Sequence, residues 1–136
     1  MYLMPEWFIT QNASAVSRVK CFVANFMEPY MLVRYGPETP LFHDKFINYG
    51  YNKVQYFENL RQMGYKFYVI NKVFAMDFPH PDSDFRVTYN SMIHNRDDNP
   101  MRTVYNKLQV SFNKKYQYRK SFPICYLRQA SYYEEI

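Results

Sequence analysis

The stretch Phe46–Gly64, FINYGYNKVQYFENLRQMG, decides the fold that this sequence predicts. A tight aromatic and glycine turn at 48–51 leads directly into a segment whose apolar residues recur at helical spacing. Asn52 is a favourable N-cap, because its side-chain oxygen can accept a backbone N–H of the first turn, and Gln55 can reach back to it. Gly64 suits the left-handed position past a helix end. We therefore predict a helix that begins at Asn52 and stops at Gly64.

This turn is also the first candidate for function. It places backbone N–H groups and Lys53 at the N-terminus of the predicted helix, where anions are favoured. The alternative is a surface loop that caps an ordinary helix and binds nothing.

Length and composition indicate one folded domain. The chain has 136 residues, with 15 Tyr and 12 Phe against only 3 Gly, a composition that excludes disorder. Aromatic side chains of this number suit strands and surfaces that stack on sugars or bases. The net charge of +5 permits an anionic partner, but the cations are dispersed and concentrate only at 114–120. We therefore predict no nucleic-acid partner.

The two cysteines leave the redox compartment open. Cys21 and Cys125 can pair in an oxidising compartment or remain apart as buried thiols, and no metal-binding Cys pattern is present. The triplet Asn12-Ala13-Ser14 is a glycosylation signal that hints at a secretory lumen. No run of apolar residues is long enough to predict a membrane span.

Period-two and apolar segments predict strands, and a second helical pattern follows them. The expected strands are 18–23, 30–34, 65–70 and 73–78. The expected second helix covers 100–118, capped by Asp98 or Asn99 and with Pro100 at its first position. We predict an α/β fold with a mixed sheet of about four strands and two main helices.

Charged residues at two predicted strand ends are further candidates. Arg34 ends the strand 30–34, and Asp77 ends the strand 73–78, three residues before His80 in a proline-rich segment. Carboxylate and imidazole groups together suit a divalent metal such as Mn²⁺. The alternative is an exit loop whose Asp and His face water. The segment 82–84, Asp-Ser-Asp, is read as a loop, because these residues form turns through local hydrogen bonds.

Three segments in order carry a family resemblance: FMEPYMLVR at 26–34, F-x-x-YGYNK at 46–53 and GYKFYVINKVFAMDFPH at 64–80. Their order and spacing resemble the C-terminal half of glycosyltransferase family 49, which includes the LARGE-type enzymes and a related β-1,4-glucuronyltransferase. The resemblance covers about residues 16–120, with an irregular lead-in at 1–15 and a tail at 121–136.

The resemblance implies a partial GT-A-like glycosyltransferase fold and transfer of glucuronic acid or xylose from a UDP-sugar to a glycan acceptor. It implies Mn²⁺ as cofactor and residence in the Golgi lumen. By the same resemblance, the substrate-binding residues are Arg34, Tyr49, Gly50, Asn52 and Lys53, and the metal ligands are Asp77 and His80.

The sequence also departs from the family pattern. Asp77 stands where the family has a histidine, and Asn48 replaces the first glycine of the turn. The Asp-x-Asp that holds metal and diphosphate belongs to an N-terminal half expected upstream, and 82–84 matches it only in letters. The alternative function is a noncatalytic glycan- or protein-binding module derived from that fold. A third hypothesis, a basic RNA- or phosphate-binding domain, is favoured only by charge and aromatic content.

Overall fold

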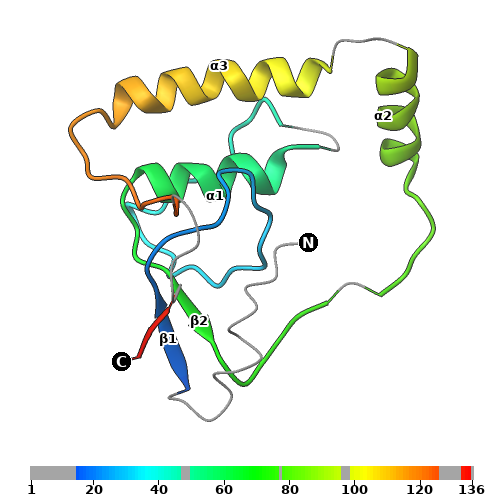
Figure 1. The fold of residues 1–136 in the computed structure, drawn as a ribbon. Coiled ribbons are helices and arrows are strands. Elements are labelled where there is room, and N and C mark those ends of the chain that lie inside the picture. Colours follow the sequence, from blue (N-terminus) through cyan, green and yellow to red (C-terminus); the bar gives the residue numbers. More distant parts are fainter. Residues whose placement is uncertain (1–14, 47–49, 77, 96–98, 126–132, 136) are drawn as a thin grey trace.

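The fold is a small arrangement of helices and short strands (Figure 1), seen in a computed structural model that describes residues 15–46, 50–76, 78–95, 99–125 and 133–135. The helices are α1 (Asn52–Gln62), α2 (Asp84–Asn95) and α3 (Pro100–Lys115), and the strands are β1 (Val16–Val19), β2 (Tyr68–Ile70) and β3 (Tyr133–Glu135). The combination of helices with a sheet confirms the coarse fold class.

The described strands form an antiparallel sheet in the order β2-β1-β3. Val16 pairs with Ile70 on one side of β1, and Val19 pairs with Tyr133 on the other. The predicted mixed sheet of about four strands is therefore wrong.

Two of the predicted strands are irregular in the structure. Neither 30–34 nor 73–76 pairs with a neighbouring strand in the described part of the chain. Several of their apolar side chains face solvent instead, with Leu32 91% exposed and Phe74 76% exposed, while Met31 is partly buried against the core. An apolar run becomes a strand only where another backbone edge is available to pair with it.

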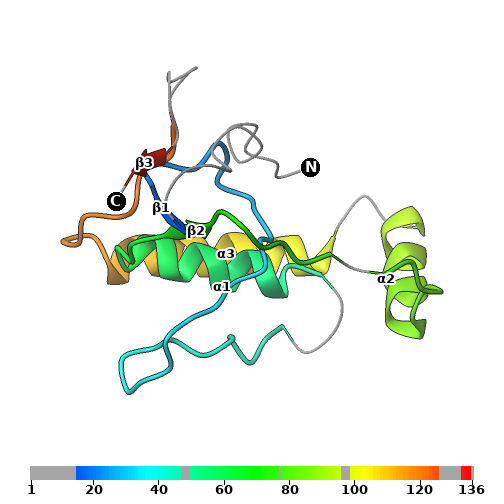
Figure 2. The same ribbon diagram turned by 90° about the horizontal axis from the view of Figure 1, so that it is seen from below.

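Helix α1 lies at the centre of the molecule, between α3 and the strands (Figure 1). Phe57 packs on the strand side in a core cluster completed by Val19, Phe22, Met27 and Phe122. A second cluster, formed by Phe46, Leu108, Phe112 and Tyr116, joins α3 to the rest of the molecule. Seen from below, α2 stands to one side of the α1–α3 pair (Figure 2).

The N-terminus of α1 differs from the prediction. The N-cap is Tyr51, in the left-handed conformation with φ 63°, and no side chain caps the helix. Asn52 is the first helical residue, and its Nδ2 donates to the Phe46 carbonyl at 3.1 Å. The capping box predicted for Asn52 and Gln55 is therefore wrong. The rings of Phe26 and Tyr105, each 5.2 Å from the Tyr51 ring, hold that residue in its place, which local sequence does not reveal.

The C-terminus of α1 confirms the prediction for Gly64. Gly64 has φ 81°, its N–H donates to the Arg61 carbonyl, and the Tyr65 N–H donates to the Leu60 carbonyl. This pair of bonds is the Schellman arrangement that ends many helices. A Cβ on Gly64 would lie 2.7 Å from the Lys120 carbonyl oxygen, so tertiary packing adds a second requirement for glycine.

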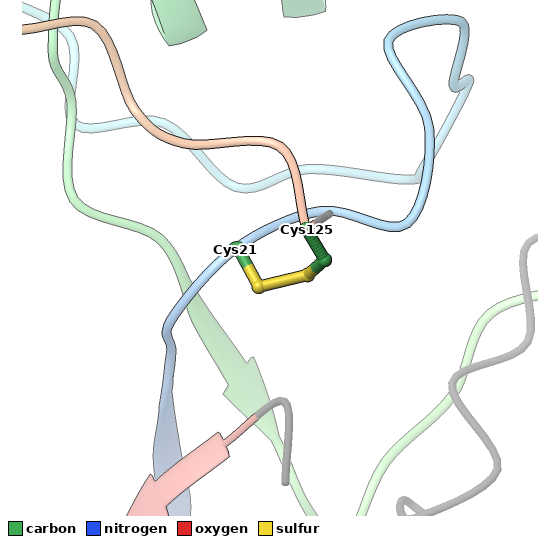
Figure 3. Close-up of a disulfide and its surroundings, with 2 residues drawn as sticks. All are labelled: Cys21 and Cys125. Atoms are coloured by element: carbon green, nitrogen blue, oxygen red, sulfur yellow. A yellow bond between two sulfur atoms is a disulfide. The ribbon is translucent and has the colours of Figure 1, made fainter. Parts of the chain in front are cut away.

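A disulfide between Cys21 and Cys125 fastens the segment that follows α3 to the end of β1 (Figure 3). The neighbouring residues Phe22 and Ile124 form a parallel bridge, in which the Cys125 N–H donates to the Phe22 carbonyl. The paired state is thus the correct one of the two alternatives that the sequence left open.

Helix α3 confirms its predicted start. Asn99 caps it, with Oδ1 accepting the N–H groups of Met101 and Arg102, and Pro100 follows at the first position. The helix ends at Lys115, three residues earlier than predicted.

Helix α2 was not predicted, and the reading of 82–84 as a loop is wrong at Asp84, where α2 begins. Ser83 Oγ accepts the Arg86 N–H, and the Arg86 guanidinium pairs with Asp82 at 3.0 Å. A serine N-cap and an i,i+4 ion pair were readable signals of this helix start.

Candidate functional site

The turn before α1 is built from two consecutive residues with positive φ, Gly50 at 101° and Tyr51 at 63°. The φ of Gly50 strongly favours glycine, and a Cβ there would also lie 2.9 Å from Cε2 of Tyr89 on α2, so that ring would have to shift. The turn brings Lys53 to the surface in the first turn of α1, and its side chain is exposed.

Tyr89 ties this turn to the two flanking helices. Its ring lies against Gly50, and its hydroxyl accepts a hydrogen bond of 2.7 Å from Asn99 Nδ2. The side-chain oxygen of Asn99 caps α3, so this one residue both caps α3 and binds Tyr89 of α2. The turn is therefore held by tertiary contacts from α2 and from the start of α3.

Three aromatic rings surround the base of the turn. Phe26, Tyr51 and Tyr105 lie 5.2 to 5.9 Å apart, centroid to centroid. Burial raises the pKa of the Tyr105 hydroxyl well above its ordinary value, and the nearby Glu58 carboxylate raises it further. Burial and the neighbouring Tyr89 likewise raise the pKa of Tyr51. Both phenols therefore stay protonated at neutral pH and serve as neutral hydrogen-bonding groups.

The surface of the turn combines a cation with an aromatic face. Lys53 Nζ lies 5.2 Å from the centroid of the Tyr30 ring, and both side chains are exposed. This cation–π contact joins the segment that begins at Tyr30 to the turn. An aromatic face suits the apolar C–H face of a sugar ring, and an ammonium group suits a carboxylate or phosphate.

The structure brings three of the predicted substrate residues, Gly50, Asn52 and Lys53, into the turn and the first turn of α1. Arg34 lies four residues beyond Tyr30 and is exposed. Its carbonyl accepts a hydrogen bond from Thr39 Oγ1, so its backbone belongs to a local turn. The remaining candidate, Tyr49, lies outside the described residues.

The predicted metal ligands are only partly described. Asp77 lies outside the described residues, and His80 is exposed, with Nδ1 2.8 Å from the Pro81 carbonyl oxygen. Within the described ranges, no group of three or more His, Cys, Asp or Glu side chains is close enough to hold a metal ion. The described part therefore shows only His80 of the two predicted ligands, and the Mn²⁺ site stays a prediction.

A buried polar network inside α1 was not foreseen from the sequence. Glu58 accepts two hydrogen bonds from the Arg61 guanidinium, at 2.7 and 2.6 Å, and Arg61 Nη1 donates to the Phe122 carbonyl. Gln62 Nε2 lies 2.8 Å from Glu58 Oε1 and 2.7 Å from an oxygen of Gln109 on α3. These contacts orient α1, and hence its N-terminal turn, against α3 and the segment that follows it.

Gln55 stands apart from this network. It is fully buried, and neither polar atom of its side chain has a hydrogen-bond partner among the described residues.

Comparison with known proteins adds no family assignment. No protein-family pattern, curated protein or solved structure matches the chain. None of the helices in the described ranges is both long and apolar enough to cross a membrane.

Proposed function

We propose that this chain is a glycosyltransferase-like protein of the family 49 type, and that its turn Gly50–Lys53, together with Tyr30, forms the acceptor-side contact with an acidic sugar. The observation that carries the proposal is the placement of Lys53 Nζ over the exposed Tyr30 ring at the rim of a left-handed turn. The turn falls within one of the three segments whose order carries the family resemblance.

Each residue of this contact has a role. Tyr30 supports the apolar face of the sugar ring, and Lys53 pairs with its carboxylate. Arg34, from the same segment as Tyr30, is a second candidate cation by the family resemblance. We assign Asn52 a structural role instead of the substrate-binding role that the resemblance implies. Its amide nitrogen already donates to the Phe46 carbonyl and so holds the turn in shape.

The disulfide supports the proposed residence in the Golgi lumen. Disulfides form and persist in oxidising compartments and are rare in the cytosol. Cys21 and Cys125 are the chain's two cysteines, and both are used in the bond.

The donor side of the reaction is proposed only by resemblance. Family 49 enzymes hold the UDP-sugar and Mn²⁺ through an Asp-x-Asp, which these 136 residues do not offer at the corresponding place. We therefore expect the 136-residue chain to bind the acceptor glycan without binding UDP-glucuronic acid or UDP-xylose in the presence of Mn²⁺.

Isothermal titration calorimetry tests both statements. A xylose–glucuronic acid oligosaccharide should bind the wild-type chain, and Lys53→Ala or Tyr30→Ala should weaken the affinity about tenfold, as expected for the loss of one charge-assisted contact or stacking partner. Lys66→Ala and Tyr68→Ala, which change exposed residues outside both proposed surfaces, are the matched controls. Equal affinity of all four variants would refute the proposed contact. Micromolar, Mn²⁺-dependent binding of a UDP-sugar would favour a catalytic protein over the noncatalytic glycan-binding alternative.

A further inference from the structure

The positive charge of the molecule is concentrated in α3 and the segment that follows it. Residues 99–125 contain six Lys or Arg and no Asp or Glu. The rest of the chain holds eleven Lys or Arg against twelve Asp or Glu, since the whole chain has 17 and 12. The net charge of +5 therefore comes entirely from this segment. Its cations are Arg102, Lys107, Lys114, Lys115, Arg119 and Lys120.

The structure leaves these cations on the surface. α3 buries Leu108 and Phe112 on the side that packs in the core, and all six cations are exposed. Lys107 and Lys114 are seven residues apart, so they lie on one side of the helix about 10 Å from each other. The ion pairs seen on α1, at the start of α2 and between His43 and Asp44 involve none of these six cations.

One buried ring gathers two of the cations past the helix end. Lys115 Nζ lies 5.0 Å from the Tyr116 ring centroid, and the Arg119 guanidinium carbon lies 5.7 Å from it. Tyr116 is itself fixed, because it is buried and its hydroxyl donates to Asn59 Oδ1 at 3.0 Å. Two like charges at one anchored ring repel each other, and a bound anion relieves that repulsion.

The helix dipole explains only part of this cluster. Cations in the last turn of a helix are favoured by its partial negative charge, which accounts for Lys114 and Lys115. Arg119 and Lys120 follow the end of α3 and lie outside the range of that effect, so the helix dipole does not account for their place in the cluster.

We infer that the outer face of α3 and the segment 116–120 form a binding surface for a linear acidic polysaccharide. The spread of cations from Lys107 to Lys120 fits a polymer with repeated charges better than a single small anion. The disulfide favours a polysaccharide over a nucleic acid, because it indicates an oxidising compartment. Tyr118, which is 94% exposed beside the cluster, offers a stacking face for a sugar ring.

The cation cluster at 114–120 lies at the opposite end of the α1–α3 pair from the turn Gly50–Lys53. The two helices run side by side in the same direction, with the turn at the start of α1 and the cluster at the end of α3 (Figure 1). The inference therefore stands independently of the proposed transferase-like site, and Lys53→Ala separates the two: it should leave polysaccharide binding by the α3 surface unchanged.

Two variants of equal net charge test the surface, with heparin as the probe. The test variant carries Lys→Gln or Arg→Gln at 114, 115, 119 and 120, and the control carries Lys→Gln at the exposed positions 20, 45, 66 and 72. Each variant changes four charges, and circular dichroism and thermal melting establish that both remain folded. In the test variant, the slope of log affinity against log salt concentration should be smaller by about 2 to 3. The control variant should retain most of the wild-type slope.

The wild-type chain provides a second readout that needs no variant. With heparin bound, Lys107, Lys114, Lys115 and Lys120 should be protected from amine acetylation, while Lys66 and Lys72 remain reactive. Equal loss of affinity in the two charge variants, or equal protection of all lysines, would overturn the inference. Tighter binding to phosphatidylserine-rich vesicles or to a single-stranded oligonucleotide than to heparin would overturn the assignment to a polysaccharide.

Discussion

Replacement of Gly64 by alanine should destabilise the protein more than any other single methyl addition to its glycines. The residue has φ 81°, and a left-handed conformation costs a non-glycine residue roughly 1 to 2 kcal/mol. The added Cβ would lie 2.7 Å from the Lys120 carbonyl oxygen, a backbone atom that moves only if the chain moves with it. Overpacking of this kind costs about 1 to 3 kcal/mol.

These two costs act against a small gain. Alanine restricts the unfolded chain and thereby stabilises the folded state by about 0.4 to 1 kcal/mol. We expect a net loss of about 2 to 4 kcal/mol, a large fraction of the stability of a small domain. Urea denaturation followed by far-ultraviolet circular dichroism measures this loss as a lower transition midpoint at unchanged slope.

The chain supplies its own control at Gly36, where a Cβ would meet nothing within 4 Å and where the backbone is not left-handed. Gly36→Ala should leave stability unchanged or raise it slightly. A midpoint for Gly64→Ala equal to that of Gly36→Ala would refute the described helix end and its contact with Lys120.

Three further predictions concern the interior. Glu58→Gln should destabilise by about 3 kcal/mol or more, because it breaks a buried ion pair and removes the carboxylate that faces the Arg61 guanidinium. The double variant Cys21→Ser/Cys125→Ser should lose about 4 to 5 kcal/mol, because the bond closes a loop of 104 residues in the unfolded chain. Gln55→Met should stabilise by about 1 kcal/mol, because a buried amide without hydrogen-bond partners is replaced by an apolar side chain of similar size.

Matched exposed positions control for the chemistry of these changes. Glu38→Gln and Gln117→Met alter the same side-chain types at the surface and should leave the urea midpoint where it is. For the disulfide, the wild-type chain treated with reductant under denaturing conditions should match the double serine variant. A Glu58→Gln variant as stable as wild type would contradict the buried ion pair. A double serine variant as stable as the oxidised wild type would contradict the stabilising role of the disulfide. A loss of stability in Gln55→Met would contradict the burial of an unpaired amide at that position.

The parts of the fold that local chemistry determines were readable from the sequence. The start of α3 rests on Asn99 and Pro100, which act on their own helix, and the end of α1 rests on the conformational freedom of Gly64. Gly50 and Tyr51, the described part of the turn predicted at 48–51, directly precede α1, and both have positive φ.

Features that depend on distant partners were not readable. β1 pairs with β3 near the other end of the chain, and the disulfide joins residues 104 positions apart. Tyr51, and not Asn52, caps α1, because rings from Phe26 and Tyr105 hold it there. In the candidate site, Lys53 was foreseen, whereas Tyr30 and Tyr89 were not, because only the folded chain brings them to the turn.

The most direct test of the proposed function is to map the acceptor contact by NMR. A xylose–glucuronic acid oligosaccharide is titrated into the ¹⁵N-labelled chain, and amide chemical shifts are followed residue by residue. We expect the largest changes on Tyr30 and on the amides of Gly50–Val54, and Lys53→Ala should abolish them. Changes confined to other residues, or a wild-type spectrum unaltered at saturating oligosaccharide, would contradict the account.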